Sequence, residues 1–313
     1  MKNWKLIDMD FKRFTINNLL INGLITTVYI LFNYLTIGLR PENYYLVAGW
    51  WLAFYVSAES RKFVLNFSFF IVFWILYDSM RILPNYEVSA VHIKEPYELE
   101  KSLFGIEYQN SLLTPNEFFL ATHNKILDFL SGFFYINWIP VPIGFAVYLY
   151  ITDKKLFLQY SIAFLLVNIV GFIVYYIYPA APPWYVQKYG FDLHIGVPGN
   201  RAGLARFDEL IGVPLFAGIY NKNANVLAAM PSLHAAYPVV VLFYAYKKQV
   251  STIFRILFIV FLLGIWFSAV YSSHHYIIDV VLGVLIAVFV LFLFNILIKV
   301  KTDKKANKGL KKI

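Results

Sequence analysis

The chain has 313 residues, of which 60% are hydrophobic and only 14% are charged, and its formal net charge is +9. A soluble protein of this size has no interior large enough to bury so many apolar side chains, so the composition excludes a soluble fold and predicts an integral membrane protein. Because the sequence contains no cysteine, disulfides, thiolate catalysis and cysteine zinc sites are also excluded.

Apolar runs recur along the chain at the length of roughly 20 residues that a helix needs to cross a bilayer, which is too long for the strands of a membrane barrel. They predict an all-α integral membrane protein, a bundle of about eight transmembrane helices. The predicted spans lie near residues 15–38, 44–58, 63–83, 131–151, 156–178, 232–247, 255–273 and 276–298. The second and sixth spans are the shortest.

Lysine and arginine gather in alternate connections between these spans. They lie before residue 15, at 59–62, 152–155 and 247–255, and from 299 onward. The positive-inside rule therefore predicts that both termini are cytoplasmic and that the loops at 84–130 and 179–231 are extracytoplasmic. The topology thus explains the positive net charge, so we expect the lipid bilayer as partner and no nucleic acid. We expect the basic tail at 299–313 to be an anchor that contacts anionic lipid.

The first outer loop contains a helix start. Thr114, Pro115 and Glu117 form a capping box with proline at the first helical position. It opens an amphipathic stretch, which we expect to lie in the membrane interface. The apolar residues of this stretch are Phe118, Phe119, Ile126, Leu127 and Phe129.

The second outer loop begins with three prolines, Pro179, Pro182 and Pro183, which end the preceding span. It runs for about fifty residues, a length that is typical of functional or disordered loops. Its apolar content favours an ordered loop packed over the spans. Its polar residues include Asn200, Arg201, Arg206, Asp208, Glu209 and Lys222.

Two segments at the predicted outer ends of spans contain candidate catalytic residues. In the first, Pro231 is suited to start a helix whose free N–H groups would attract an anion near Ser232 and His234. In the second, His275 and Asp279 are four residues apart, so a helix would place them on one face, where the carboxylate orients the imidazole.

This combination suits nucleophilic catalysis on phosphorus. His275 would attack, Asp279 would hold its ring, and His234 would protonate the departing oxygen and later deprotonate the acceptor. A divalent metal held by the histidine and the carboxylate is the competing interpretation, but no further ligands occur at suitable spacing. We therefore expect neither a metal nor another cofactor.

The segment Pro-Ser-x-His at 231–234, followed by Ser268, His275 and Asp279, resembles the second and third signature motifs of the phosphatidic acid phosphatase type 2 superfamily. Within it, several stretches resemble the inositol-phosphorylceramide synthase branch. These stretches are Tyr178 to Trp184, Gly203 to Asp208, His274-His275-Tyr276, Tyr77-Asp78 with Arg81, and Leu103-Phe104-Gly105.

The resemblance implies a six-helix phosphatase-like core with His275 as nucleophile, Asp279 as its orienting residue and His234 as the acid. It suggests a division into an N-terminal pair of spans at 1–62, the catalytic core at 63–298 and the basic tail at 299–313. Two departures from the superfamily pattern matter. Ala269 replaces the arginine beside the serine of the third motif, and the first motif, a lysine followed seven residues later by Arg-Pro, is not evident.

The phosphate must therefore be bound by other groups. We expect Arg206 to be its main ligand because a guanidinium matches phosphate oxygens. Further candidates for substrate binding are Arg201, Lys222, Ser232, Ser272, His274, Asp78 and Arg81. Asp78 and Arg81 lie at i, i+3 near the outer end of the third span, where a pair with each other and a place in the substrate pocket are equally expected.

These observations favour a phosphotransferase that moves a phosphorylated head group, such as phosphoinositol, from a phospholipid to a lipid alcohol such as ceramide. We expect it in the plasma membrane, with the active site on the extracytoplasmic side. One alternative is a lipid phosphate or diphosphate phosphatase that uses water as acceptor. The other is a lipid or ion transporter, in which the ionisable residues are relay groups. The sequence leaves the oligomeric state open.

Overall fold

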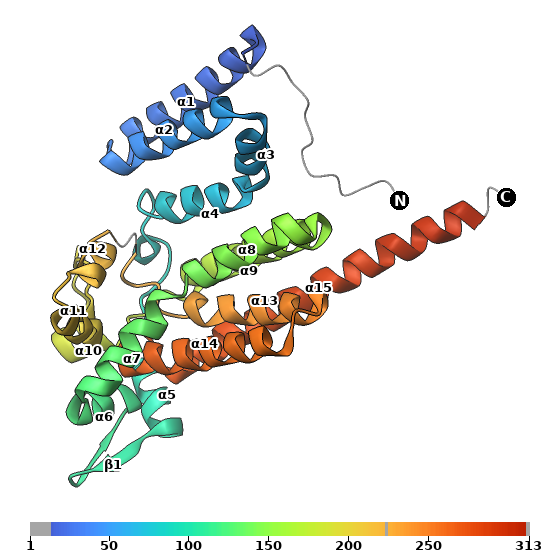
Figure 1. The fold of residues 1–313 in the computed structure, drawn as a ribbon. Coiled ribbons are helices and arrows are strands. Elements are labelled where there is room, and N and C mark those ends of the chain that lie inside the picture. The colour runs from blue at the N-terminus through green and yellow to red at the C-terminus, as the bar shows by residue number, and fades with distance from the viewer. Residues whose placement is uncertain (1–13, 223–224, 311–313) are drawn as a thin grey trace. The chain divides into compact units, whose positions relative to one another are not determined.

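The computed structural model describes residues 14–222 and 225–310, and most of the described chain is helical (Figure 1). It consists of two compact units, an N-terminal unit at Lys2–Leu83 and a C-terminal unit that begins at Pro84. The predicted functional division at residues 62 and 63 remains a prediction. Its basic tail lies partly outside the described residues.

The N-terminal unit contains the helices α1 (Ile16–Thr36), α2 (Pro41–Val56), α3 (Ala58–Asn66) and α4 (Ser68–Ser79). Buried polar contacts join α1 to α2, because polar groups that meet inside a membrane satisfy each other. Trp50 donates to Asn22 over 2.8 Å, and Asn43 donates to Asn33 over 3.2 Å. α3 and α4 meet at an angle of 49°, so the predicted span near 63–83 is a bent pair of helices.

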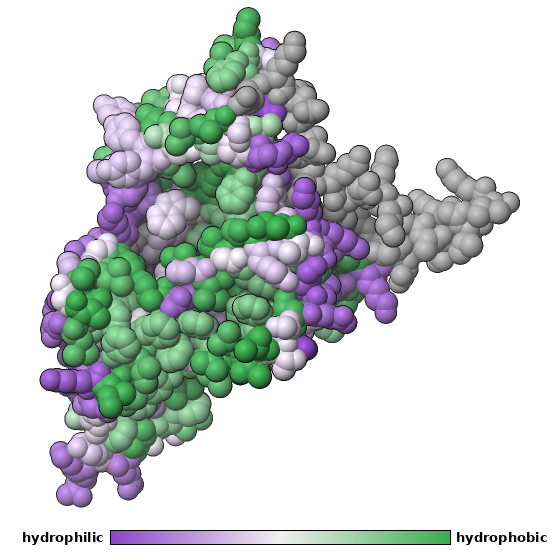
Figure 2. Space-filling view, viewed as in Figure 1, coloured by the Kyte–Doolittle hydropathy of each residue, from purple (hydrophilic) through white to green (hydrophobic). Residues whose placement is uncertain are grey.

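The C-terminal unit contains a bundle of helices of 12 to 34 residues. They are α7 (Lys125–Ile136), α8 (Pro140–Thr152), α9 (Lys154–Ile177), α13 (Leu233–Lys248), α14 (Thr252–Tyr271) and α15 (Ile277–Leu310). α13 packs against α8, α9, α14 and α15, so it lies at the centre of the bundle. Figure 2 shows broad hydrophobic areas over the bundle helices, as expected for a surface in contact with lipid.

Within the described residues, five helical segments are long and apolar enough to span a membrane, or six if α3 and α4 count as one. The segments near 15–38, 131–151, 156–178, 255–273 and 276–298 are therefore confirmed as membrane-length helices. The predicted second and sixth spans correspond to α2 and α13, each 16 residues long. The helical membrane protein is confirmed, but the count of eight full spans is not.

The first outer loop contains η1 (Asn85–Glu87), α5 (Lys94–Phe104), a hairpin of β1 (Ile106–Tyr108) and β2 (Ser111–Leu113), and α6 (Pro115–Thr122). In the hairpin Ile106 pairs with Leu113 in antiparallel register. The predicted capping box is confirmed at the start of α6. The predicted amphipathic stretch is divided between two helices, because Asn124 caps a new helix and residues 126–129 belong to α7, part of a membrane-length segment.

The second outer loop contains α10 (Pro183–Tyr189), η2 (Ala202–Leu204), α11 (Ala205–Ile211) and α12 (Leu215–Tyr220). Phe207 and Phe216 of this loop share a buried apolar cluster with Tyr135 of α7 and Ala269 of α14. The Trp184 amide also donates to the Ser273 carbonyl over 3.0 Å. These contacts attach the loop to the ends of the bundle helices near the turn between α14 and α15.

Candidate active site

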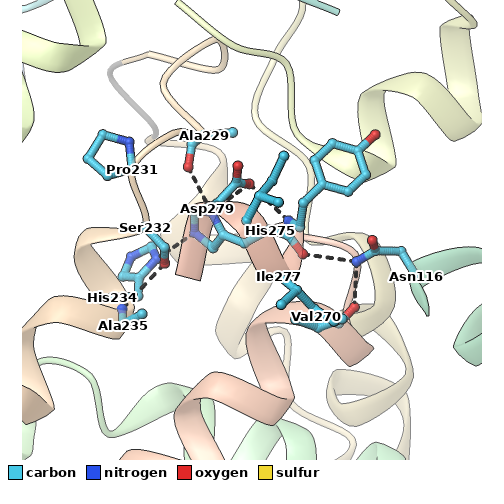
Figure 3. Close-up of polar contacts among 12 residues, drawn as sticks. Asn116, Ala229, Pro231, Ser232, His234, Ala235, Val270, His275, Ile277 and Asp279 are labelled. Atoms are coloured by element: carbon cyan, nitrogen blue, oxygen red, sulfur yellow. Dashed lines mark hydrogen bonds and ion pairs between the residues drawn. The ribbon is translucent and has the colours of Figure 1, made fainter. Parts of the chain in front are cut away.

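Two histidines from distant parts of the chain meet at the ends of α13 and α15. His234 lies in the first turn of α13, and His275 lies in the turn between α14 and α15. Nδ1 of His234 is 3.2 Å from Nε2 of His275, and the His275 side chain is buried (Figure 3). The structure therefore brings together the two imidazoles that the sequence proposed as acid and nucleophile.

The start of α13 is held directly against α15. Ser232 caps α13 by accepting a hydrogen bond from the Ala235 amide, and its own amide donates to the Asp279 carbonyl over 2.9 Å. A Cβ atom at Gly283 would overlap the Ser232 carbonyl, so only glycine permits this approach. The predicted helix start at Pro231 is wrong, because α13 begins at Leu233 with Ser232 as its cap.

The ring of His275 is held by a backbone carbonyl. Nδ1 lies 2.9 Å from the Ala229 carbonyl oxygen but 3.6 Å from Oδ2 of Asp279, which accepts the Tyr276 amide instead. Ala229 is thus the nearer partner of Nδ1, and the prediction that Asp279 orients the ring stays a prediction. A proton on Nδ1 that points at Ala229 leaves a lone pair on Nε2, the nitrogen that faces His234. Asp279 remains at ion-pair distance.

Backbone hydrogen bonds between three separate segments fix the Ala229 carbonyl. The Ala229 amide donates to the Ala180 carbonyl over 3.1 Å, and the Ala180 amide donates to the Leu227 carbonyl over 3.0 Å. His92 in the first outer loop adds a third segment, because its amide donates to the Pro179 carbonyl over 2.8 Å. Ala229 contacts His275 through its backbone carbonyl, a group that every residue has. The sequence alone therefore does not identify Ala229 as part of the site.

Asn116 of α6 holds the turn that carries His275. Its side-chain amide donates to the carbonyls of Val270 and His275 over 2.8 and 2.9 Å, as Figure 3 shows. Asn116 is fully buried, so these bonds are shielded from water. The sequence analysis did not identify Asn116 as part of the site, because it lies inside the capping box between Thr114 and Glu117. Its position next to aromatic residues was the one feature that could have indicated a buried amide.

Glu100 of α5 caps the helix that carries Asp279. Its two carboxylate oxygens accept the amides of Ile277 and Ile278 over 2.9 and 3.2 Å. Glu100 is fully buried, and this burial, with the nearby charge of Asp279, raises its pKa to about 7 although the two amides oppose the shift. The sequence places it 177 residues from Ile277, so no local pattern predicts the contact.

Arg206 lies near the turn that carries His275, and one nitrogen of its guanidinium group makes no hydrogen bond within the described chain. Its Nε donates to Asp128 of α7 over 2.5 Å, and Asp128 also accepts the Tyr271 hydroxyl over 2.8 Å. Its Nη2 is buried and has no hydrogen-bond partner in the described chain. A Cβ atom at Gly203 would lie 3.0 Å from this nitrogen and 2.8 Å from Cα of Ser272, so Gly203 packs closely against both groups.

The other polar candidates of the second outer loop and the turn have different positions. Arg201 pairs with the buried Asp208 over 3.0 Å, and Lys222 is exposed just after α12. The Ser272 hydroxyl donates to the Ser268 carbonyl over 2.6 Å, so like Ser232 it already has a local partner. That these groups bind the phosphate stays a prediction.

His274 is buried in an aromatic stack. Its ring lies between Tyr220 of α12 and Tyr135 of α7, with centroid distances of 4.3 and 5.6 Å. Burial, followed by the nearby His275, lowers the pKa of His274 to about 3, against the opposing effect of the Arg201 carbonyl. The ring stacks on two tyrosines and is neutral near pH 7, and its predicted contact with a phosphate stays a prediction.

Asp78 and Arg81 belong to the N-terminal unit, where they form the predicted pair. Nε of Arg81 lies 3.1 Å from Oδ1 of Asp78, and Arg40 at the start of α2 pairs with the same carboxylate. The pair therefore stabilises the junction of α2 and α4. Their place in the substrate pocket stays a prediction. Among the described residues, no three histidine, aspartate or glutamate side chains form a group that would hold a metal ion.

Comparison with known proteins adds to this geometry. The profile of the PAP2 superfamily matches residues 102–293. The chain is 47% identical over 261 residues to the phosphoinositol dihydroceramide synthase of Bacteroides thetaiotaomicron. The aligned region covers 83% of this chain and 86% of that protein. No solved structure matches the chain.

Two fungal relatives are similar over a smaller share of their length. The catalytic subunit of inositol phosphorylceramide synthase of Saccharomyces cerevisiae is 30% identical over 240 residues, covering 72% of this chain and 55% of that protein. The Candida albicans inositol phosphorylceramide synthase is 26% identical over 225 residues, covering 69% and 44%. The matched region includes both histidines, Asp279 and Arg206, and the chain therefore belongs to the PAP2 superfamily, among its lipid phosphotransferases.

Proposed function

We propose that this protein transfers phosphoinositol from a phosphatidylinositol-type donor to the hydroxyl of a ceramide-type lipid through a phosphohistidine at His275. The observation that carries the proposal is the approach of His234 Nδ1 to His275 Nε2 at 3.2 Å, with the opposite nitrogen of His275 held by Ala229. The substrates are suggested by the names of the bacterial and fungal relatives.

The geometry supports transfer in two steps. Nε2 of His275 attacks phosphorus, and the bond from phosphorus to the diacylglycerol oxygen breaks as that oxygen takes a proton from His234. The hydroxyl of the ceramide-type acceptor then attacks phosphorus and gives its proton to His234, while the bond to His275 breaks. Asp279, at 3.6 Å from Nδ1, stabilises the positive charge on the His275 ring.

Arg206 supplies positive charge for the phosphate in this proposal. A buried guanidinium nitrogen without a partner is costly, and a phosphate oxygen would satisfy it with a charge-assisted hydrogen bond. Asp128 accepts a hydrogen bond from Nε and leaves Nη2 without a partner in the described chain. Arg206 therefore compensates for the absence of an arginine at position 269.

The site lies beside the loops at 84–130 and 179–231, and the basic residues of the short connections favour an extracytoplasmic position for these loops. We accordingly propose that transfer occurs on the extracytoplasmic side of the plasma membrane, with both termini inside. The exposed apolar surface of the bundle helices lets a lipid approach from the side. Reaction of an impermeant reagent with a single engineered cysteine in the β1–β2 hairpin of intact cells tests the topology.

Purified protein in phosphatidylinositol vesicles, with labelled ceramide added, tests the activity. The expected product is labelled inositol phosphorylceramide, formed with release of diacylglycerol, and His275→Asn should form none. His194→Asn is the matched control, because His194 is an exposed histidine whose ring contacts Tyr189 and none of the residues proposed for the site. Release of free inositol phosphate without a new lipid would instead identify a hydrolase, and turnover by His275→Asn would refute the nucleophile.

A further inference from the structure

The hydroxyl of Tyr135 in α7 contacts the same nitrogen that His234 directs at His275. Its Oη lies 2.9 Å from Nδ1 of His234, and the Tyr135 side chain is fully buried. The two rings meet edge to face at a centroid distance of 5.2 Å. No sequence motif includes Tyr135, which lies 99 residues before His234.

The surroundings of Tyr135 fix the position of its hydroxyl. The ring stacks on His274 with an interplanar angle of 17°, and Phe216 of the second outer loop packs 6.4 Å from its centroid. Tyr220 of the same loop hydrogen-bonds the hydroxyl. A side chain fixed in this way can hold a catalytic ring within the narrow limits that proton transfer requires.

Phosphate binding makes this contact necessary. The 3.2 Å separation between the two histidines leaves no room for phosphorus, so their mutual contact must open when the substrate enters. His234 then loses its contact with His275, and the described part of the chain provides one other side-chain hydrogen bond to Nδ1, from Tyr135.

A hydroxyl is suited to this role because it both donates and accepts. When Nδ1 of His234 carries the proton, Oη of Tyr135 and the leaving oxygen share it, because the leaving oxygen takes the position that Nε2 of His275 has in the structure. After the proton has moved to diacylglycerol, Nδ1 has a lone pair and Tyr135 donates to it. Tyr135 keeps its own proton in both steps, and His234 recovers a proton from the acceptor hydroxyl.

Building on the proposed phosphotransfer, we infer that Tyr135 is the positioning residue for the acid and base His234. It orients Nδ1 toward the leaving oxygen when the contact with His275 is lost. The consequence is specific to proton transfer. A donor whose leaving group needs no proton should not depend on Tyr135.

The variant Tyr135→Phe tests this inference, with Tyr244→Phe as its matched control. Tyr244 is also fully buried, and its hydroxyl has no hydrogen-bond partner in the described chain, so the control removes the same atom without a contact. With phosphatidylinositol as donor, Tyr135→Phe should lower kcat by roughly 10-fold to 100-fold, part of the usual effect of acid–base catalysis, with little change in KM. Tyr244→Phe should transfer at the wild-type rate.

A second donor separates positioning from a general structural defect. The 4-nitrophenyl ester of inositol phosphate releases nitrophenolate, which needs no protonation, so the burst of nitrophenolate in Tyr135→Phe should stay within about 3-fold of wild type. Equal losses with both donors, or equal rates of Tyr135→Phe and Tyr244→Phe with the lipid donor, would overturn the inference. Absence of transfer by the wild-type protein would instead refute the proposed function.

A second variant covers the case in which Tyr135→Phe does not fold. Incorporation of 3,5-difluorotyrosine at position 135 keeps the hydroxyl and makes it a stronger donor, which favours the unprotonated Nδ1 of His234. The fall in activity with rising pH should therefore move to lower pH. An unchanged pH profile would contradict the contact between Tyr135 and His234 during catalysis.

Discussion

Replacing Glu100 with glutamine should remove a pH dependence of stability that is built into the start of α15. Glu100 is fully buried, and it accepts the amides of Ile277 and Ile278. Its pKa is raised from 4.5 to about 7 in the folded protein, because burial opposes the charge more strongly than the two amides favour it. Glutamine keeps an acceptor oxygen but does not ionise.

The sign and size of the effect follow from linkage between protonation and folding. A group whose pKa is raised on folding contributes its full stability below its unfolded value, and this contribution is lost as the pH rises through the folded value. For Glu100 the window therefore runs from about pH 4.5 to about pH 7. The shift corresponds to roughly 3 kcal/mol.

Thermal unfolding in detergent micelles at several pH values between 5 and 8 measures this effect. The melting temperature of the wild type should fall across the range by several degrees more than that of Glu100→Gln, since about 1 kcal/mol changes the melting temperature by roughly 2–4 °C. Glu98→Gln is the control, because Glu98 lies on the same helix, is exposed and pairs with Lys94. Equal pH dependence of the wild type and Glu100→Gln would refute the reasoning.

Three further substitutions test the support of the site. Asn116→Asp should lower the free energy of unfolding by about 2–4 kcal/mol and abolish transfer, because an acceptor would face the carbonyls of Val270 and His275. Asn137→Asp, at a partly exposed amide, is the control. Equal melting temperatures of the two variants would contradict the contact of Asn116. Gly283→Ala should reduce transfer at least 10-fold, because a Cβ atom there would overlap the Ser232 carbonyl and move α15 away from α13. Gly144→Ala is the control and should be active, because a Cβ atom at Gly144 would meet open space. Full activity of Gly283→Ala would refute this packing. Asp128→Asn should raise KM for the phospholipid donor several-fold because Arg206 loses its charged partner, and an unchanged KM in kinetic assays would exclude this role.

Much of the protein could be predicted from local sequence. Membrane-length helices follow from apolar runs, and the cap of α6 follows from Thr114, Pro115 and Glu117, because these signals act within a few residues. The approach of His234 to His275 was also predicted, because both lie at outer ends of neighbouring spans. The break between α6 and α7 was missed, although Asn124 is a good helix cap, because the apolar pattern continues across it.

The residue types of the candidate site and the membrane-length helices were thus predicted from the sequence, since side-chain chemistry and hydrophobicity are properties of single residues and short runs. Only the tertiary structure decided what holds the two imidazoles. The Ala229 carbonyl at 2.9 Å from His275, the Glu100 cap and the Tyr135 hydroxyl come from three distant segments. A backbone carbonyl has the same chemistry at every position, and a buried glutamate or tyrosine gains its partner only when helices meet. These supports therefore depend on the packing of α5, α7, α13 and α15, which no short pattern in the sequence records.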